Sequence, residues 1–135
     1  MAERYDIVIV GGGIAGLACA LSVPGKARIA VVDKGEAGAG SSPLAQGGIA
    51  AAVGPNDSPD LHASDTIAAG VGLCDETVVE DICAEGPGVV AWLEDLGCRF
   101  DRSEDGSLDL AREGGQSVGR SVHATDATGG EIVRA

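Results

Sequence analysis

Residues 5–17 read YDIVIVGGGIAGL, an apolar segment that passes directly into three spaced glycines and then into a second apolar segment. Gly11, Gly13 and Gly16 have the spacing of a dinucleotide-binding turn between a strand and a helix. Gly11 permits the tight turn, Gly13 lets the backbone approach a pyrophosphate, and Gly16 lets the helix lie close to the sheet. A glycine-rich turn that binds nothing is the alternative, and the flanking strand and helix patterns disfavour it.

A second short apolar segment, Arg28–Val32, is followed directly by an acid, Asp33. Its length and β-branched residues between turn signals predict a strand parallel to the first one. Asp33 follows the glycines at about the 20-residue distance expected of the acid that binds a ribose. Because this carboxylate would repel a 2′-phosphate, the pattern favours FAD or NAD over NADP. The fold class predicted is therefore α/β, a Rossmann-like domain with a parallel sheet and added helices.

Composition limits the possible partners. The chain has 135 residues, 44% of them apolar, which is enough for the core of one domain or part of one. A net charge of −12 disfavours nucleic acid and anionic membrane surfaces, since both would repel it. An anionic small substrate stays possible, because arginines and helix N-termini can act locally within a cleft.

The cysteines and the N-terminal residues indicate the cellular compartment of the protein. Cys19, Cys74, Cys83 and Cys98 show no CxxC spacing, so we expect reduced, buried thiols and no metal site. The N-terminus carries acids and only a short apolar strand, which predicts neither a signal peptide nor a membrane span. These features predict a cytoplasmic protein.

The stretch Gly38–Gly48, GAGSSPLAQGG, is rich in small residues. A flexible linker is one interpretation. However, the stretch begins beyond the carboxyl end of the second strand, where open α/β sheets place their ligands, which favours a cofactor-contacting loop. The side chains of Ser41, Ser42 and Gln46 and the N–H groups of Gly47 and Gly48 could contact the cofactor.

Helices are expected in the middle of the chain. Asp60 is a plausible N-cap for a helix through Ala69, and Asp75 for another over Glu76–Glu85. A third helix is expected over Gly88–Leu96, with Pro87 in its first turn. We expect these helices, and His62, to be structural.

The last informative stretch is residues 108–132, which follow a polar turn at 101–105 that we interpret as a charged surface loop. A strand-like start reaches Arg112 and Glu113, a Gly-Gly turn follows, and a helix is expected near Thr128. A solvated loop and a substrate site are about equally consistent with these residue types. Candidate site residues in the stretch are Arg112, Glu113, Arg120, His123 and Asp126, although His123 could instead be a packed or capping histidine.

Longer blocks of the sequence resemble a known family. The chain is similar to the N-terminal part of the L-aspartate oxidases, within the succinate dehydrogenase and fumarate reductase flavoprotein superfamily. The matching blocks are VIVGGGIAGLA at 8–18, SSPLAQGGIAAA at 41–52, HASDTIAAGVGLCD at 62–75, AREGGQS at 111–117 and HATDATGGEI at 123–132.

The resemblance implies an enzyme that uses FAD to oxidise L-aspartate to iminoaspartate, with oxygen or fumarate as electron acceptor, in NAD biosynthesis. It implies a small dicarboxylate, L-aspartate or fumarate, as ligand and a hand-off of product to quinolinate synthase. Glu113 matches the carboxylate that orients the substrate. With the residues read from the pattern above, the expected cofactor-binding set is Gly11, Gly12, Gly13, Ile14, Ala15, Gly16, Asp33, Lys34, Ser41, Ser42, Pro43, Leu44, Ala45, Gln46, Gly47 and Gly48.

Ser41 stands where succinate dehydrogenase flavoproteins have the histidine that bonds covalently to the flavin, so the resemblance implies noncovalent FAD. Gln116, Gly119 and Gly130 depart from the histidine and basic residues usual in the family, which reduces the positive charge expected near the substrate. Residues 1–135 are expected to form the N-terminal part of an incomplete FAD-binding domain, with the capping domain, the C-terminal helical domain and the catalytic arginine outside it. A succinate or fumarate oxidoreductase and a non-catalytic nucleotide-binding fragment are the alternatives.

Overall fold

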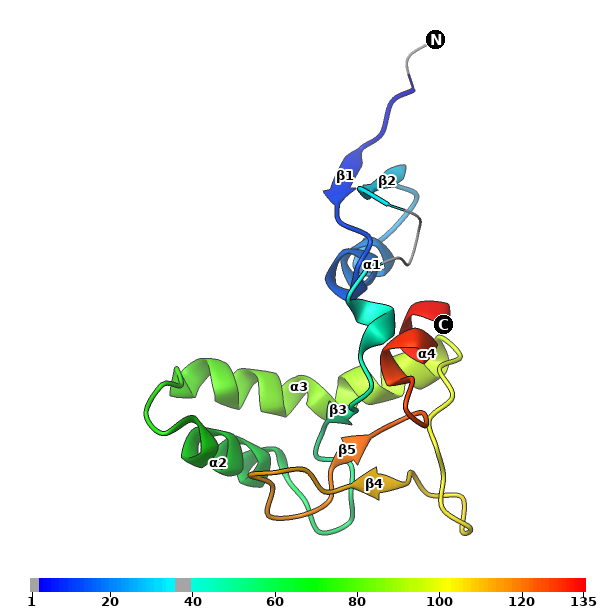
Figure 1. Ribbon diagram of the computed structural model, residues 1–135. Coiled ribbons are helices and arrows are strands. Elements are labelled where there is room, and N and C mark those ends of the chain that lie inside the picture. The colour runs from blue at the N-terminus through cyan, green and yellow to red at the C-terminus, as the bar shows by residue number, and fades with distance from the viewer. Residues whose placement is uncertain (1–2, 36–39) are drawn as a thin grey trace.

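A computed structural model describes residues 3–35 and 40–135 of the chain (Figure 1). Helices and strands alternate through the first third, and longer helices follow. The elements in chain order are β1 Ile7–Val10, α1 Ile14–Ser22, β2 Ile29–Val32, the 3₁₀ turn η1 Ser42–Leu44, β3 Ile49–Ala50, α2 Pro59–Gly70, α3 Glu76–Asp95, β4 Leu110–Ala111, β5 Ser121–Val122 and α4 Thr128–Arg134.

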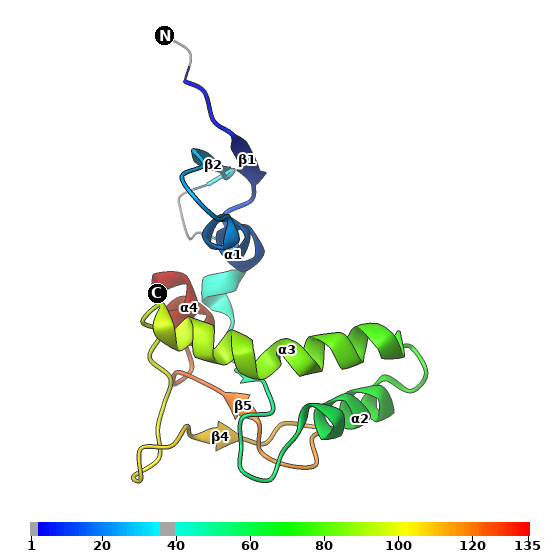
Figure 2. The same ribbon diagram turned by 180° about the vertical axis from the view of Figure 1, so that it is seen from behind.

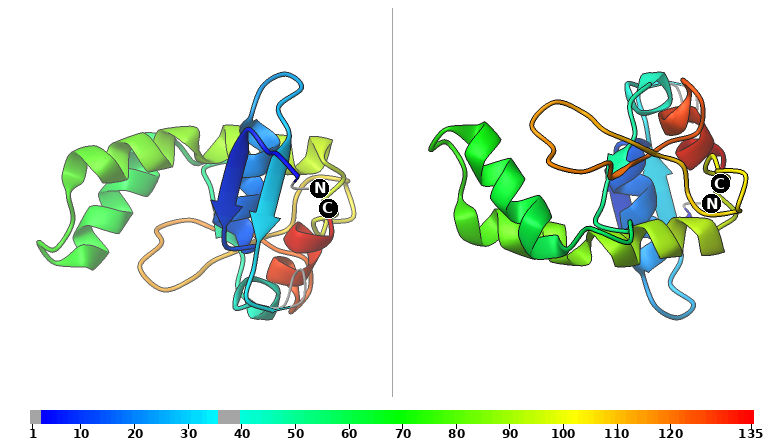
Figure 3. Two further views of the ribbon diagram at one scale, coloured as in Figure 1. Left: turned by 90° about the horizontal axis from the view of Figure 1, so that it is seen from above. Right: turned by 90° about the horizontal axis from the view of Figure 1, so that it is seen from below.

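The first three elements form the predicted β–α–β unit. β1 and β2 pair in parallel from Ile7 with Ile29 to Val10 with Val32, which confirms the predicted arrangement. Figure 3 shows the two strands side by side over α1. Regular pairing begins after Asp6 and Arg28, where the Asp6 N–H donates to the Arg28 carbonyl (2.8 Å) and the Asp6 carboxylate accepts from the Arg28 N–H (2.8 Å).

A second sheet is antiparallel with the strand order β3–β5–β4, and only β4, within the strand-like segment expected before Glu113, was predicted from the sequence. Val122 of the central strand pairs with Ile49 on one side and with Leu110 on the other. Each strand has only two residues, too few to show the alternation by which a strand is recognised in a sequence.

Two predictions about the middle helices are wrong. The N-cap of α2 is Ser58, whose Oγ accepts from the Leu61 N–H (3.1 Å), and not Asp60. The helices expected over 76–85 and 88–96 are one helix, α3, with Pro87 inside it. Proline normally forces the preceding residue out of the helical region by a clash with its Cβ, but here that residue is Gly86, which has none.

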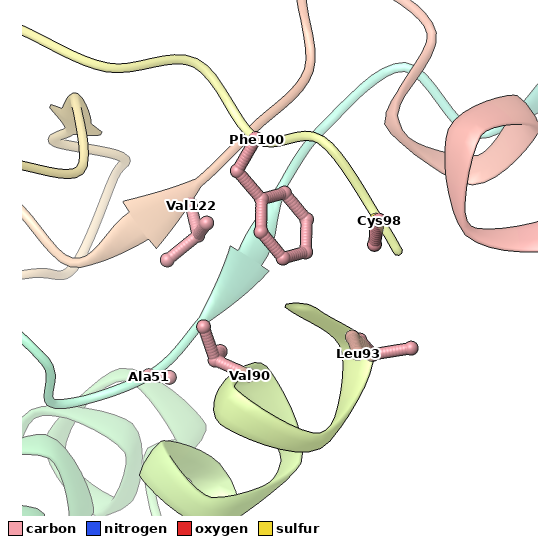
Figure 4. Packing of buried hydrophobic residues seen from close by; sticks show 6 residues of the cluster. All are labelled: Ala51, Val90, Leu93, Cys98, Phe100 and Val122. Carbon is pink, nitrogen blue, oxygen red and sulfur yellow. The ribbon is translucent and has the colours of Figure 1, made fainter. Parts of the chain in front are cut away.

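The buried core is formed by side chains from residues 51–122, which lie outside the β1–α1–β2 unit. Val90 and Leu93 of α3 pack against Ala51, Cys98, Phe100 and Val122 (Figure 4). In contrast, β1, α1 and β2 contribute no residue to the buried core, and Val10 is 87% exposed. The β1–α1–β2 unit therefore has no buried core of its own, and the packed core lies in the rest of the molecule.

The two halves meet along α3. The β1–α1–β2 unit lies on one side of this helix, while α2 and the antiparallel sheet lie on the other (Figures 1 and 2). Beside α1, η1 packs closely on α4, where the Gly129 N–H donates to the Ala45 carbonyl (3.0 Å). A Cβ on Gly129 would stand 1.9 Å from the Ser42 carbonyl oxygen, so this approach requires glycine.

All four cysteines are free, but their burial differs from the prediction. Cys83 and Cys98 are buried, as expected. Cys74 is half-buried, and Cys19 is exposed because α1 buries none of its residues. Among the described residues, no helix combines the length and apolar character that crossing a membrane requires.

Candidate functional site

The glycine turn has the geometry that its sequence predicts. Gly11 adopts φ +112° and donates its N–H to the Val32 carbonyl (2.8 Å), which holds the end of β1 beside the end of β2. A Cβ on Gly16 would lie 1.9 Å from the Gly11 carbonyl oxygen, so α1 can approach the strand this closely only with glycine there. The first-turn N–H groups of a helix have no partner within it and can bind an anion.

Asp33 lies directly across from this turn. Its carboxylate accepts the Gly12 N–H (2.6 Å) on one oxygen and the Gly35 N–H (3.1 Å) on the other. Both hydrogen bonds lower the pKa of Asp33 and keep the carboxylate charged, and the one from Gly12 has the larger effect. A carboxylate has about four acceptor positions, so each oxygen keeps room for a hydroxyl group.

The serine-rich loop is attached to the same turn. Ser42 Oγ accepts the N–H of Ile14, the first residue of α1, at 3.2 Å. Residues 42–44 form η1, which packs on α4, so this part of the loop has a fixed position and is not a flexible linker. The first two residues of the predicted loop, 38 and 39, lie outside the described residues.

The loop continues into a pocket of about 430 Å³. Residues from the two predicted site regions, 46–48 and 113–126, meet there, although they are far apart in the sequence. The lining residues are Gln46, Gly47, Gly48, Asp101, Ala111, Glu113, Ser121, His123, Thr125 and Asp126. Three of the candidates, Glu113, His123 and Asp126, therefore share one cavity with the end of the loop.

Gln116 braces the turn that carries Glu113. Its Oε1 accepts the Glu113 N–H (2.8 Å), and its Nε2 donates to Ser121 Oγ (3.1 Å) on β5. Arg112 folds back on the same turn and donates from Nε to the Gln116 carbonyl (2.8 Å). The residue singled out as a departure from the family pattern thus fixes the Glu113 backbone to the strand.

Arg120 does not line the pocket, although it was a candidate site residue. Its side chain is fully buried, with Nε donating to Asp57 Oδ2 (2.9 Å) and Nη1 lying 2.8 Å from Asp65 Oδ2. Burial works against its charge, but the two carboxylates outweigh burial and raise the pKa of Arg120. The position is structural, because the side chain joins α2 and the 54–58 turn to β5.

His62 lies near this buried cluster. Burial first, and then the Arg120 charge, lower the pKa of His62, which favours the neutral ring. Its Nδ1 is buried without a hydrogen-bond partner in the described part of the chain. This placement agrees with the expected structural role.

Asp101 is a pocket residue that the sequence analysis assigned to a surface loop. Its Oδ2 accepts the Thr125 N–H (2.6 Å) and lies 3.1 Å from His123 Nδ1. The run DRSEDG looks like an exposed turn, and only long-range pairing brings its first residue to the pocket. No local signal in the sequence could have identified it.

Comparison with known proteins identifies the family. A model described as "FAD binding domain" matches residues 6–135. The chain belongs to this FAD binding domain family. FAD is accordingly its cofactor, which decides between the FAD and NAD that the glycine pattern left open.

Similar sequences and structures agree with this assignment of an FAD binding domain. An L-aspartate oxidase of Nicotiana tabacum is 49% identical over 131 residues, which are 97% of this chain and 20% of that protein. An L-aspartate oxidase of Streptomyces coelicolor is 48% identical over 96% of this chain and 23% of its own length. An E. coli quinol fumarate reductase structure matches with a TM-score of 0.88 and 34% identity over 98% of this chain and 23% of that one. The predicted resemblance is confirmed, and the chain spans about a fifth to a quarter of the length of these relatives.

The residues present fit the flavin nucleotide. The chain offers a close approach of α1 to the strand that requires glycine at position 16, a helix N-terminus of the kind that binds pyrophosphate, and a charged Asp33 of the kind that binds a ribose. No group of three or more His, Cys, Asp or Glu side chains within residues 3–35 and 40–135 is arranged to hold a metal ion.

Proposed function

We propose that this chain supplies a cofactor-binding part of an FAD-dependent L-aspartate oxidase, which oxidises L-aspartate to iminoaspartate for NAD biosynthesis. The observation that carries the proposal is the pocket in which Glu113 faces the end of the loop at Gln46–Gly48. A carboxylate in that place can bind an α-ammonium and discriminate aspartate from dicarboxylates that lack nitrogen. The names of the relatives, L-aspartate oxidase at 44–49% identity, support the same substrate.

Each part of the described chain has a role in this proposal. Gly11–Gly16 hold the pyrophosphate at the N-terminus of α1, Asp33 with Lys34 binds the adenosine end, and Ser41–Gly48 contact the flavin. When bound, FAD accepts the electron pair that leaves the substrate. Glu113 orients the substrate amino group, and Gln116 keeps the Glu113 backbone in place. The product would pass to quinolinate synthase, and oxygen or fumarate would accept the electrons.

A succinate or fumarate oxidoreductase is the second candidate, because solved quinol fumarate reductases share this fold at TM-scores of 0.88 and 0.89. The two candidates differ at Ser41, where a covalent flavin attachment would need a histidine. We propose noncovalent FAD. Denaturation in acid should release all the flavin into the supernatant, whereas flavin that stays with the precipitated chain would favour the second candidate.

The direct test uses the product of the complete reading frame, loaded with FAD. L-Aspartate is expected to bleach the flavin absorbance without oxygen and to generate hydrogen peroxide with oxygen, while succinate does neither at the same concentration. Bleaching by succinate alone would reject the proposal, and bleaching by neither substrate would favour a non-catalytic nucleotide-binding protein.

Glu113→Gln tests the proposed role of the Glu113 carboxylate in the pocket. The amide keeps the size of the side chain but loses the charge that pairs with an ammonium, so KM for L-aspartate should rise by about tenfold or more. Binding of succinate, which has no ammonium, should change little. An equal loss for both ligands would show that Glu113 acts on the shape of the pocket and not on the amino group.

A further inference from the structure

His123 and Asp101 both line the Glu113 pocket, and the Asp101 carboxylate holds the His123 ring. The His123 side chain is 22% exposed, and Nδ1 lies 3.1 Å from Asp101 Oδ2. The same Asp101 oxygen accepts the N–H of Thr125, which has the left-handed φ of +48°. The carboxylate thus fixes both the ring and the turn that follows it.

This pairing determines which ring nitrogen of His123 is free. A carboxylate can only accept hydrogen bonds, so Nδ1 carries the proton that points to Asp101. In the neutral ring, Nε2 then has a lone pair and no proton. The nearest carboxylate oxygen recorded for Nε2 is Asp109 Oδ2 at 3.8 Å, which is beyond hydrogen-bond distance. His123 therefore offers a proton acceptor beside Glu113.

Oxidation of an amino acid requires such an acceptor. The substrate enters with an ammonium group, and one N–H bond must break, with its electron pair left on nitrogen, before the Cα–H can leave as hydride to FAD. The result is a C=N double bond, one proton on the acceptor and two electrons with one proton on the cofactor. Dicarboxylates that lack nitrogen have no N–H proton to lose, and their oxidation removes a proton from carbon instead.

We propose that His123 takes this proton at Nε2 and that Asp101 is the positioning residue that keeps the ring in the required tautomer, an inference that rests on the proposed oxidation of L-aspartate. The pocket carboxylates Glu113, which orients the ammonium, and Asp126 are both exposed to solvent, whereas the His123 side chain is partly buried. A carboxylate-imidazole pair that removes a proton is an established arrangement for base catalysis.

The test compares His123→Gln, Asp101→Asn and Glu104→Gln in the FAD-loaded product of the complete reading frame. His123→Gln should lower kcat/KM for L-aspartate by about 10²- to 10⁴-fold, the usual worth of a positioned base. The loss should shrink at alkaline pH, where more of the free substrate carries a neutral amine. Asp101→Asn, which keeps an oxygen for the Thr125 N–H, should lose at least about tenfold, and the control Glu104→Gln, on an exposed turn, less than about threefold.

Two further measurements separate proton transfer from folding. The dissociation constant of succinate, read from the flavin absorbance, should change less than about twofold in every variant. ¹⁵N spectra of histidine-labelled protein, with His123 assigned from the His123→Gln difference, should show the Nδ1–H tautomer in the wild type and its loss in Asp101→Asn.

Each adverse result has a distinct meaning. A pH profile of His123→Gln that parallels the wild type, an equal loss of succinate binding, or a His123 ring protonated on Nε2 alone overturns the inference and leaves the proposed function standing. A wild-type protein that oxidises succinate but not L-aspartate overturns the proposed function, and this inference with it.

Discussion

Gly16 is the residue whose replacement tests the nucleotide turn most directly. In Gly16→Ala, the new Cβ would stand 1.9 Å from the Gly11 carbonyl oxygen, so α1 must move away from β1. Overpacking of this kind costs about 1–3 kcal/mol, and it also displaces the N–H groups that we propose to face the phosphates. We expect the dissociation constant of FAD, measured by quenching of flavin fluorescence, to rise at least about tenfold.

Gly88→Ala is the matched control, because a Cβ at Gly88 meets nothing within 4 Å. Gly88 lies inside α3, where alanine is more stable than glycine by about 1 kcal/mol, so this variant should unfold at a higher temperature and bind FAD unchanged. Unchanged FAD affinity in Gly16→Ala would contradict the assigned role of the turn.

Arg120 shows how residue type alone can mislead. A sequence cannot distinguish an arginine that binds substrate from one that is fully buried between Asp57 and Asp65. Arg120→Met would leave two carboxylates without their cation and should lower the free energy of unfolding by about 3–5 kcal/mol. Arg102→Met, which removes a half-exposed pair with Glu94, should cost less than about 1 kcal/mol. Urea denaturation of both variants measures the difference, and equal losses would contradict the structural assignment.

At the scale of elements, what could be predicted depends on how local the signal is. β1, α1 and β2 follow from short patterns and were predicted close to their observed bounds, and a helix was expected near Thr128, where α4 begins. The antiparallel sheet depends on pairs such as Ile49 with Val122, which no local pattern encodes. The family resemblance placed Glu113 beside the substrate and the loop beside the flavin, so their convergence could be expected. The contact between Asp101 and His123 could not be expected, because it too depends on pairing between distant segments.

The position of α4 depends on Glu131, so we expect the stability of the protein to depend on the ionisation of this carboxylate. The Glu131 carboxylate pairs with Arg134 and accepts the Arg99 N–H, which joins α4 to the segment after α3. Arg134 first, and the Arg99 hydrogen bond to a lesser degree, lower the pKa of Glu131 to about 2, although burial opposes the shift. Because the folded pKa is depressed, this stabilisation is fully present above pH 4.5 and is lost between about pH 4.5 and 2.

We therefore expect Glu131→Gln to lower the urea midpoint at pH 6 and to flatten its decline between pH 4.5 and 3 relative to the wild type. Glu104→Gln, on an exposed turn, should leave the curve unchanged and serves as the control. A Glu131→Gln curve that runs parallel to the wild type across this range would show that the carboxylate does not hold α4.

At the scale of the whole molecule, the cofactor-binding unit and the packed core are separate. The core lies between α3 and the antiparallel sheet, while β1 and β2 expose Val8, Val10, Val31 and Val32. Regions with few buried apolar contacts open at lower free energy than the core. The unit that binds FAD should therefore be the less stable part of the chain in the absence of cofactor.

Hydrogen exchange followed by mass spectrometry checks this prediction. Without FAD, peptides that cover 7–17 and 29–33 should exchange much faster than those of α3 at 88–95. Because a ligand that binds only the folded form stabilises it by about 2.7 kcal/mol at a hundredfold excess over its dissociation constant, FAD should slow exchange in the first two peptides by up to about a hundredfold. Gly16→Ala should abolish this protection while leaving exchange in α3 as in the wild type. Uniform exchange across all peptides, or equal protection of α3 by FAD, would instead show one cooperative unit in which the nucleotide turn has no stability of its own.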